Sequence, residues 1–211
     1  MGTDIYGFIE VRDRFIDLSE PDDEDEILRW HPAGALDHYY DGRSYYAFGC
    51  LFGVRDRTFE PLAPGRGFPE DASRASTRAF REDTDAHSPS WISWGELESA
   101  AWDEPAALRV HSRAFEYHRG PDGEWVWYGC GTSDERLAEL TKTSLRTVMH
   151  ADEHWPEGTE WLDGDRLFRI SRLTRRQVVP DEEWGDVWTA MKTLAKRHGP
   201  DHVRLVVWFD N

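Results

Sequence analysis

Alternating apolar and polar residues on both sides of a turn sequence predict a β-hairpin in the second half of the chain. The side chains alternate in polarity from Arg109 to His118, and they alternate again at Trp125 and Trp127. Successive side chains of a strand point to opposite faces, so a period of two is typical of strands that bury one face. The sequence Pro121-Asp-Gly123 lies between the two stretches and has the residue types of a tight turn.

The same period of two predicts further strands. Ile5, Ile9 and Val11 share one face of an N-terminal strand that begins at Asp4. A return strand at Phe15–Leu18 would complete an N-terminal hairpin. Extended segments are also expected at 90–92, 167–173 and 203–209.

Helices are expected between these strands. Ser93-Trp-Gly-Glu96 matches a capping box, in which serine accepts a backbone hydrogen bond and glutamate reaches back. This motif predicts a helix at 94–101, and periodicity and end signals predict others at 43–55, 133–149 and 181–197. We therefore expect an α+β protein, a mainly antiparallel sheet with helices packed against it, in a single globular domain over residues 1–211.

The composition is that of a folded, acidic protein. Hydrophobic residues make up 39% of the 211 residues, which is enough for the core of one domain. Lysine and arginine total 25 against 41 acidic residues, so the net charge is −16. Such a surface repels a phosphate backbone unless its basic residues are clustered, and general nucleic-acid binding is not expected.

Acidic residues gather near the N-terminus. Six of the seven residues from Glu20 to Glu26 are acidic, and their mutual repulsion predicts a solvated loop at about 19–34. No apolar run is long enough to cross a membrane, and the first residues contain neither a basic nor an apolar leader segment. We expect a cytoplasmic protein that does not bind membranes.

One candidate site is the polar face of the first strand. The period of two places Asp4, Tyr6, Phe8 and Glu10 together, opposite Ile5. Two acids and an aromatic ring are suited to lining a site, but charges on a solvated edge strand also discourage aggregation. Both interpretations fit this segment.

A second candidate is the segment Asp85-Ala-His-Ser-Pro-Ser-Trp91, which we expect to form a loop before a strand. A carboxylate near His87 can fix the tautomer of the imidazole, which then acts as a base or a metal ligand. The alternative is a hydrogen-bonded turn, because aspartate, serine and proline all favour loops.

A third candidate is His150-Ala-Asp-Glu-His154, which fits the H-x-x-E-H pattern of one class of zinc peptidases. In that pattern His150 and His154 bind the metal from one helical face, and Glu153 serves as the base. Pro156 follows closely and disfavours helix at the preceding residue, and a further metal ligand would be required.

Five motifs spread over the whole chain form a set. They are Met1-Gly-Thr-Asp-Ile-Tyr6 with Glu10, Arg43-Ser-Tyr45, Pro64-Gly-Arg-Gly-Phe-Pro-Glu-Asp-Ala-Ser73, Asp85-Ala-His-Ser-Pro-Ser-Trp91 and Trp208-Phe-Asp-Asn211. This set resembles a family of small uncharacterised proteins of bacteriophages and actinobacteria, with MGCDIH-like, PRGLPDD-like, HSHSW-like and FDN segments. The resemblance implies no established activity. Tyr6 and Pro89 stand where that family has histidines, which removes two imidazoles from any metal site.

The polar residues of these motifs lead to a first functional hypothesis. A fold that brought them into one cleft would form a hydrolase-like site for a small polar or phosphate-bearing molecule. The catalytic candidates are His87, Asp85, Asp4 and Glu10. The substrate-binding candidates are Arg43, Arg66, Ser88, Ser90, Trp91 and Tyr6, with Asp71 nearby in the same motifs.

Two alternatives use other features. The first is a non-catalytic binding protein, such as a phage-type accessory factor that sequesters a ligand or blocks a basic protein through its acidic surface. The second is a zinc hydrolase built on His150, Glu153 and His154. No nicotinamide or flavin cofactor is expected, because no phosphate-binding glycine motif occurs, whereas a divalent metal is compatible with the residues. Eleven tryptophans are present, and an exposed subset of them could stack on sugars or nucleobases.

Overall fold

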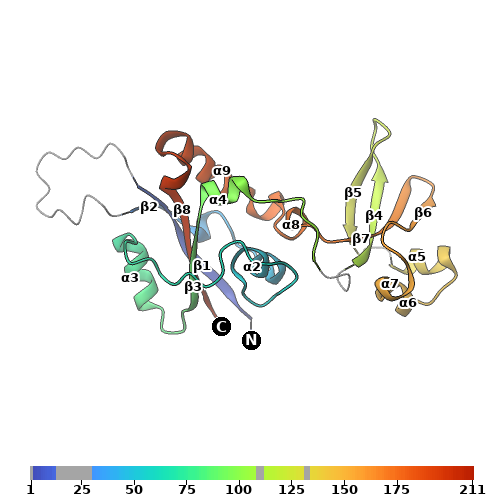
Figure 1. Ribbon diagram of the computed structural model, residues 1–211, viewed down its shortest axis with the longest axis horizontal. Coiled ribbons are helices and arrows are strands. Elements are labelled where there is room, and N and C mark those ends of the chain that lie inside the picture. The colour runs from blue at the N-terminus through green and yellow to red at the C-terminus, as the bar shows by residue number, and fades with distance from the viewer. Residues whose placement is uncertain (1, 13–29, 108–111, 131–133) are drawn as a thin grey trace, which may run out of the picture. The chain divides into compact units, whose positions relative to one another are not determined.

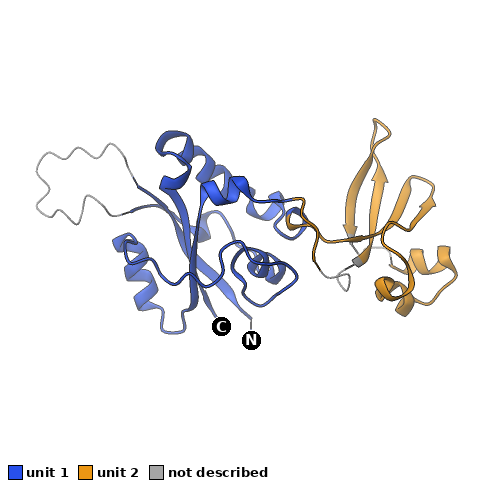
Figure 2. Cartoon of the chain, viewed as in Figure 1, with its two compact units in different colours: residues 1–102, 176–211 blue, residues 103–175 orange. Residues whose placement is uncertain are grey.

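The computed structural model describes residues 2–12, 30–107, 112–130 and 134–211 (Figure 1). Its contacts divide the chain into two compact units (Figure 2). Unit 1 comprises Met1–Trp102 and Arg176–Asn211, and unit 2 comprises Asp103–Arg175. Each unit has its own four-stranded antiparallel sheet and helices, so the predicted α+β class with antiparallel sheets is confirmed.

Unit 1 is built on the sheet β2-β1-β8-β3. Its strands are β1 (Asp4–Val11), β2 (His31–Ala35), β3 (His87–Ser93) and β8 (Val203–Asp210). The last strand, β8, runs antiparallel to β1 in an unbroken register from Asp4 opposite Asp210 to Val11 opposite Val203. Seven of its eight residues are buried, as expected for an apolar strand with neighbours on both sides.

The partner of β1 on the other side differs from the prediction. The proposed return strand at Phe15–Leu18 lies outside the described residues, and β1 pairs instead with β2. Residues 31–34 therefore belong to a strand and not to the predicted acidic loop, because their backbone groups are paired with those of β1. The remainder of that loop, except Trp30, lies outside the described residues.

Helices pack on both faces of the unit 1 sheet. Phe48 of α2 (Tyr45–Phe52) packs edge-on against Phe209 of β8, and Tyr40 joins Phe48 to Trp184 of α9 (Asp181–His198). The neighbouring residue of β8, Trp208, points to the other face and contacts Phe80 of α3 (Arg74–Glu82). The sheet therefore lies between α2 and α9 on one side and α3 on the other (Figure 1).

Helix boundaries follow the local end signals. The helix predicted at 43–55 is shorter because Ser44 caps the start of α2 and Gly53 ends it in the left-handed conformation, with φ 75°. The capping box is confirmed at the start of α4 (Trp94–Ser99), where both of its hydrogen bonds are present. The short helices of unit 1 are η1 (Leu36–His38) and η3 (Pro200–His202), and α8 (Arg175–Val178) spans the boundary between the units.

Unit 2 confirms the central hairpin. Its strand order is β5-β4-β7-β6, with β4 (Ser112–Arg119), β5 (Trp125–Cys130), β6 (Glu160–Asp163) and β7 (Arg166–Arg172). The turn between β4 and β5 places Gly123 at φ 87°. Its helices are α5 (Asp134–Thr141), α6 (Leu145–Met149) and α7 (Ala151–His154), which pack on the sheet through Leu137, Val148 and Phe168.

The single helix predicted at 133–149 is wrong. The chain leaves the helical conformation at Lys142, whose φ is 54°, and Ser144 then caps a second helix, α6.

Among the described residues, no helix is long and apolar enough to cross a membrane.

Candidate functional site

Glu10 lies in a buried ion-pair network. Its side chain is fully buried. One carboxylate oxygen accepts hydrogen bonds from the Ser73 backbone at 2.8 Å and the Ser76 hydroxyl at 2.6 Å, and the other accepts from Arg204 at 2.9 Å. Arg204 also donates to Asp71 at 2.9 Å. These contacts fix Glu10 between β1, β8 and α3.

Arg66, Ser90 and Trp91 hold the 61–69 loop against β3. The guanidinium of Arg66 donates to both carboxylate oxygens of Glu96, at 3.0 and 2.7 Å, and lies 4.9 Å from the centre of the Trp91 ring. The Ser90 hydroxyl is buried and donates to the Ala63 carbonyl at 2.6 Å. The polar groups of Arg66 and Ser90 are therefore used in internal contacts.

Asp4, Arg43 and Tyr6 lie at the other end of β1. Arg43 makes a two-pronged ion pair with Asp4, with distances of 2.7 and 2.6 Å, and both side chains are partly exposed. Tyr6 is 42% exposed. Its pKa is raised above 10 by partial burial and by the nearby carboxylates of Asp4, Asp210 and Asp83, against the opposing effect of Arg43. A phenol with a raised pKa remains a hydrogen-bond donor at neutral pH.

His87 and Ser88 lie in strand β3 and not in the predicted loop, because His87 pairs with Phe209 across a bulge. The imidazole stacks on the Phe209 ring at 6.2 Å, and its Nδ1 is 3.0 Å from the Ser88 hydroxyl. Asp4 pairs with Asp210, which follows Phe209 in β8. Successive residues of a strand point to opposite faces, so Asp4 and His87 lie on opposite faces of the sheet.

The structure does not bring the predicted catalytic residues together. Glu10 and Asp4 belong to separate ion pairs, His87 contacts the other face of β8, and the exposed Asp85 bonds through its backbone N–H to Asp83. The hydrolase hypothesis therefore stays a prediction without a common cleft for its residues.

The His150–His154 segment does not form one continuous helix. His150 ends α6 and precedes the four-residue α7, with φ −116° and ψ 46°, and its Nδ1 is hydrogen-bonded to the Arg146 carbonyl at 2.9 Å. In the described part of the chain, no group of three or more histidine, cysteine or acidic residues could hold a metal ion. The zinc hypothesis thus lacks a described ligand set.

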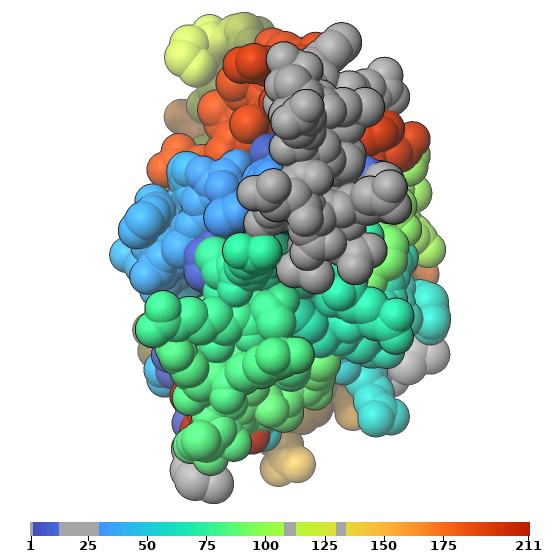
Figure 3. Space-filling model, turned by 90° about the vertical axis from the view of Figure 1, so that its left-hand side faces the viewer, coloured from blue at the N-terminus to red at the C-terminus, as the bar shows by residue number. Residues whose placement is uncertain are grey.

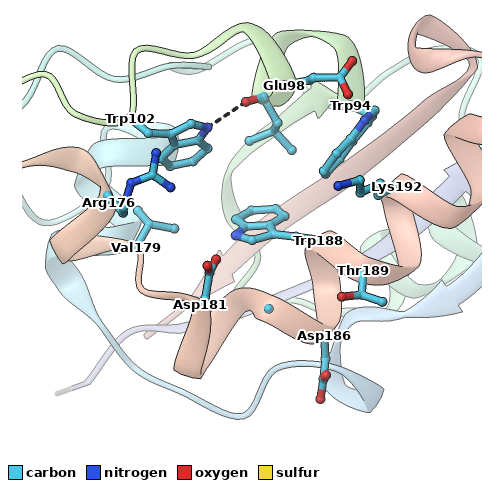
Figure 4. A pocket seen from close by; sticks show the side chains of 12 residues that line it. Trp94, Glu98, Trp102, Arg176, Val179, Asp181, Asp186, Trp188, Thr189 and Lys192 are labelled. Carbon is cyan, nitrogen blue, oxygen red and sulfur yellow. Dashed lines mark hydrogen bonds between the residues drawn. The ribbon is translucent and has the colours of Figure 1, made fainter. Parts of the chain in front are cut away.

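A pocket of about 580 Å³ in unit 1 was not predicted from the sequence (Figure 4). It lies between α4 and α9 and is bordered by the segments around Trp102 and Arg176. Three half-buried indoles line it, those of Trp94, Trp102 and Trp188. Figure 4 shows these rings on three sides of the hollow.

Each indole has a different support. Trp188 stacks on the fully buried Trp184 with ring centres 5.1 Å apart, so the core of unit 1 fixes its position. Trp102 donates its indole N–H to the Leu97 carbonyl at 2.9 Å. Trp94 is the first residue of α4, and the capping box at Ser93 fixes that end of the helix.

Charged side chains of both signs surround these rings. Glu98, Asp181 and Asp186 supply carboxylates, and Arg176 and Lys192 supply cationic donors. In Figure 4, Asp181 lies beside Trp188, Arg176 beside Trp102, and Lys192 beneath Trp94. Aromatic faces with a few polar groups around them are typical of small-molecule sites, where the rings supply contact area and the polar groups fix orientation.

Part of the pocket could have been recognised from the sequence. Asp181, Trp188 and Lys192 recur at helical spacing on α9, but the pattern does not show that this face is left open beside α4. Trp102 and Arg176 are far apart in sequence and meet through a backbone hydrogen bond of 2.8 Å from Arg176 to Trp102. This contact depends on where the chain enters and leaves unit 2.

Comparison of the chain with protein-family models, curated proteins and solved structures gives no match. The resemblance to the phage and actinobacterial family stays a prediction.

Proposed function

We propose that the protein is a ligand-binding protein whose unit 1 pocket takes a small, polar, ring-shaped molecule, a sugar or a nucleobase. The observation that carries this proposal is the set of three indoles, Trp94, Trp102 and Trp188, around one pocket of about 580 Å³. Ring-shaped ligands gain contact area on aromatic faces, and stacking of a base on an aromatic side chain contributes about 1–3 kcal/mol.

The charges around the pocket support a ligand that both donates and accepts hydrogen bonds. Carboxylates such as Asp181 accept from hydroxyl or amino groups, and Arg176 and Lys192 donate to carbonyl or hydroxyl oxygens. The three indoles surround one pocket, whereas the predicted catalytic residues share no cleft, and this supports binding over the hydrolase hypothesis. A cytoplasmic location remains part of the proposal.

The test is calorimetric titration of the purified protein with a panel of monosaccharides, nucleobases and nucleosides. Trp94→Ala should weaken binding of the active compound about tenfold or more, because a stacking surface is lost. Trp127→Ala, which removes a 39% exposed tryptophan from unit 2, should leave the affinity unchanged.

A second pair of variants tests the polar contacts. Asp181→Asn should weaken binding, whereas Glu182→Gln, which removes the same charge from the first turn of α9 outside the pocket, should not. If no compound of either class binds, or if Trp94→Ala and Trp127→Ala behave alike, the proposal fails. Turnover of a phosphate ester that is abolished by His87→Ala would favour the hydrolase hypothesis instead.

A further inference from the structure

The edge strands of the two sheets differ in how they are protected from pairing with other strands. An edge strand presents unpaired backbone groups, and proteins block such edges with proline, charged residues, bulges or short strands. The edges of the unit 1 sheet are β2 and β3, which contain Pro32 and Pro89. The β6 edge of unit 2 has only four residues and carries Glu160 and Asp163 at its ends.

The remaining edge strand, β5, contains no charged residue and no proline. Its sequence from Trp125 to Cys130 is Trp-Val-Trp-Tyr-Gly-Cys. In the described part of the chain it is hydrogen-bonded to β4 alone. Three consecutive apolar side chains are exposed along it, Val126 at 57%, Trp127 at 39% and Tyr128 at 59%.

The regular part of this edge is short and self-complementary. Trp125, Val126 and Trp127 pair in register with β4, and a bulge follows at Tyr128. If two copies of this segment pair antiparallel about Val126, each Trp125 lies opposite Trp127 of the other copy, on the same face of the sheet. Cross-strand aromatic pairs of this kind stabilise a sheet.

From these features we infer that β5 is a dimerisation edge, where a second copy of the chain continues the unit 2 sheet about a twofold axis at Val126. The pairing is isologous, so it closes after two chains and uses the same edge of each. No residue of β5 is charged, so two copies of the strand pair without bringing like charges together.

The test is sedimentation equilibrium of the full chain over a range of concentrations. The mass should rise from 24.5 kDa towards twice that value as concentration increases. Val126→Lys should hold the chain at the monomer mass, because it places two ammonium groups directly opposite each other. The matched control is Leu162→Lys on β6, which changes a 63% exposed apolar residue at the opposite edge and should dimerise like the original chain.

A cross-link locates the pairing independently of the lysine variants. Directly opposite residues of antiparallel strands have Cα atoms about 4.5–5.5 Å apart, a separation that a disulfide bridges. Val126→Cys should therefore form a reducible covalent dimer on oxidation, and Leu162→Cys should not. A chain that stays monomeric at every concentration, or a Val126→Lys variant that still dimerises, would overturn the inference. A monomer that instead binds a strand from another protein would also overturn it.

Discussion

At the scale of single residues, the ion pair between Glu10 and Arg204 shows why a polar face need not be a site. Arg204 is only 3% exposed, and its guanidinium lies 4.1 Å from the centre of the Trp30 ring. Removing one partner of a buried ion pair loses its charge and weakens the hydrogen bonds that it accepts. Arg204 keeps its second carboxylate, Asp71, at 2.9 Å, so Glu10→Gln should lower the free energy of unfolding by about 1–3 kcal/mol, measured by chemical denaturation.

The matched control is Glu82→Gln, which breaks the exposed pair of Glu82 with Arg78. Exposed pairs contribute about 0–1 kcal/mol, so this variant should unfold almost as the original protein does. If the two variants lower the free energy of unfolding equally, burial of Glu10 does not determine its contribution to stability.

Tyr6 gives a second prediction at this scale. Its pKa is raised by burial and by three carboxylates, of which Asp83 also accepts a hydrogen bond from the Trp208 indole. Asp83→Asn keeps an acceptor for that indole and removes one negative charge, so the pKa of Tyr6 should fall towards 10 and remain above it. Ultraviolet titration of the phenol measures this, with Tyr6→Phe to assign the transition. An unchanged or higher pKa in the variant would refute the assignment.

At the scale of elements, the capping box at Ser93 links stability to the pocket because α4 carries Trp94, Leu97 and Glu98. Ser93→Ala removes the serine acceptor and should destabilise the protein by about 1 kcal/mol. Burial raises the pKa of Glu96, but hydrogen bonds from Arg66 and Ser93 outweigh it, and the net pKa is lowered. The stabilisation by this carboxylate is therefore present above its ordinary pKa of 4.5 and is lost as the pH falls through the lowered value.

The lowered pKa of Glu96 predicts how the stability of the Ser93→Ala variant depends on pH. Denaturation of the original protein and of Ser93→Ala from neutral to acidic pH should show a difference in stability that narrows in acid, because the variant loses the hydrogen bond from the Ser93 hydroxyl that favours the ionised Glu96. Ser99→Ala, at the other end of α4, is the control and should show no such narrowing. A difference that widens in acid would contradict this account.

Elements with local signals could be predicted from the sequence, and those that depend on distant contacts could not. The hairpin of β4 and β5, strand β1 and helices α4 and α9 follow from periodicity, a turn or caps. The break at Lys142 was missed because its left-handed backbone has no marker such as glycine. Strand β6 was missed because it is short and acquires its structure from pairing with β7.

The candidate site was harder to predict for the same reason. Period two correctly places Asp4 and Glu10 on one face of β1, but it does not show that Arg204, from the far end of the chain, forms an ion pair with Glu10. The pocket tryptophans are visible in the sequence as aromatic residues. Their meeting depends on α4 and α9, which are separated in the chain by all of unit 2.

At the scale of the whole molecule, unit 2 is an insertion into unit 1. The chain leaves unit 1 after Trp102 and returns at Arg176, and these two residues are joined by a backbone hydrogen bond of 2.8 Å. An inserted unit whose two ends lie close together can be removed without stretching the remaining chain. The single domain expected from the sequence makes the opposite prediction, that removal abolishes folding.

We expect a variant with residues 103–175 replaced by a short glycine-serine linker to unfold cooperatively and to retain the tryptophan pocket, since every described residue that lines it belongs to unit 1. Circular dichroism during denaturation and calorimetric titration with the active compound measure these two properties. The complementary variant, Phe168→Ala in the full chain, removes a buried ring of unit 2 and should destabilise that unit by about 3–5 kcal/mol while leaving ligand affinity unchanged. If the shortened chain instead loses its cooperative transition, or if Phe168→Ala unfolds both units together, the chain behaves as one domain and the pocket depends on unit 2 for its structure.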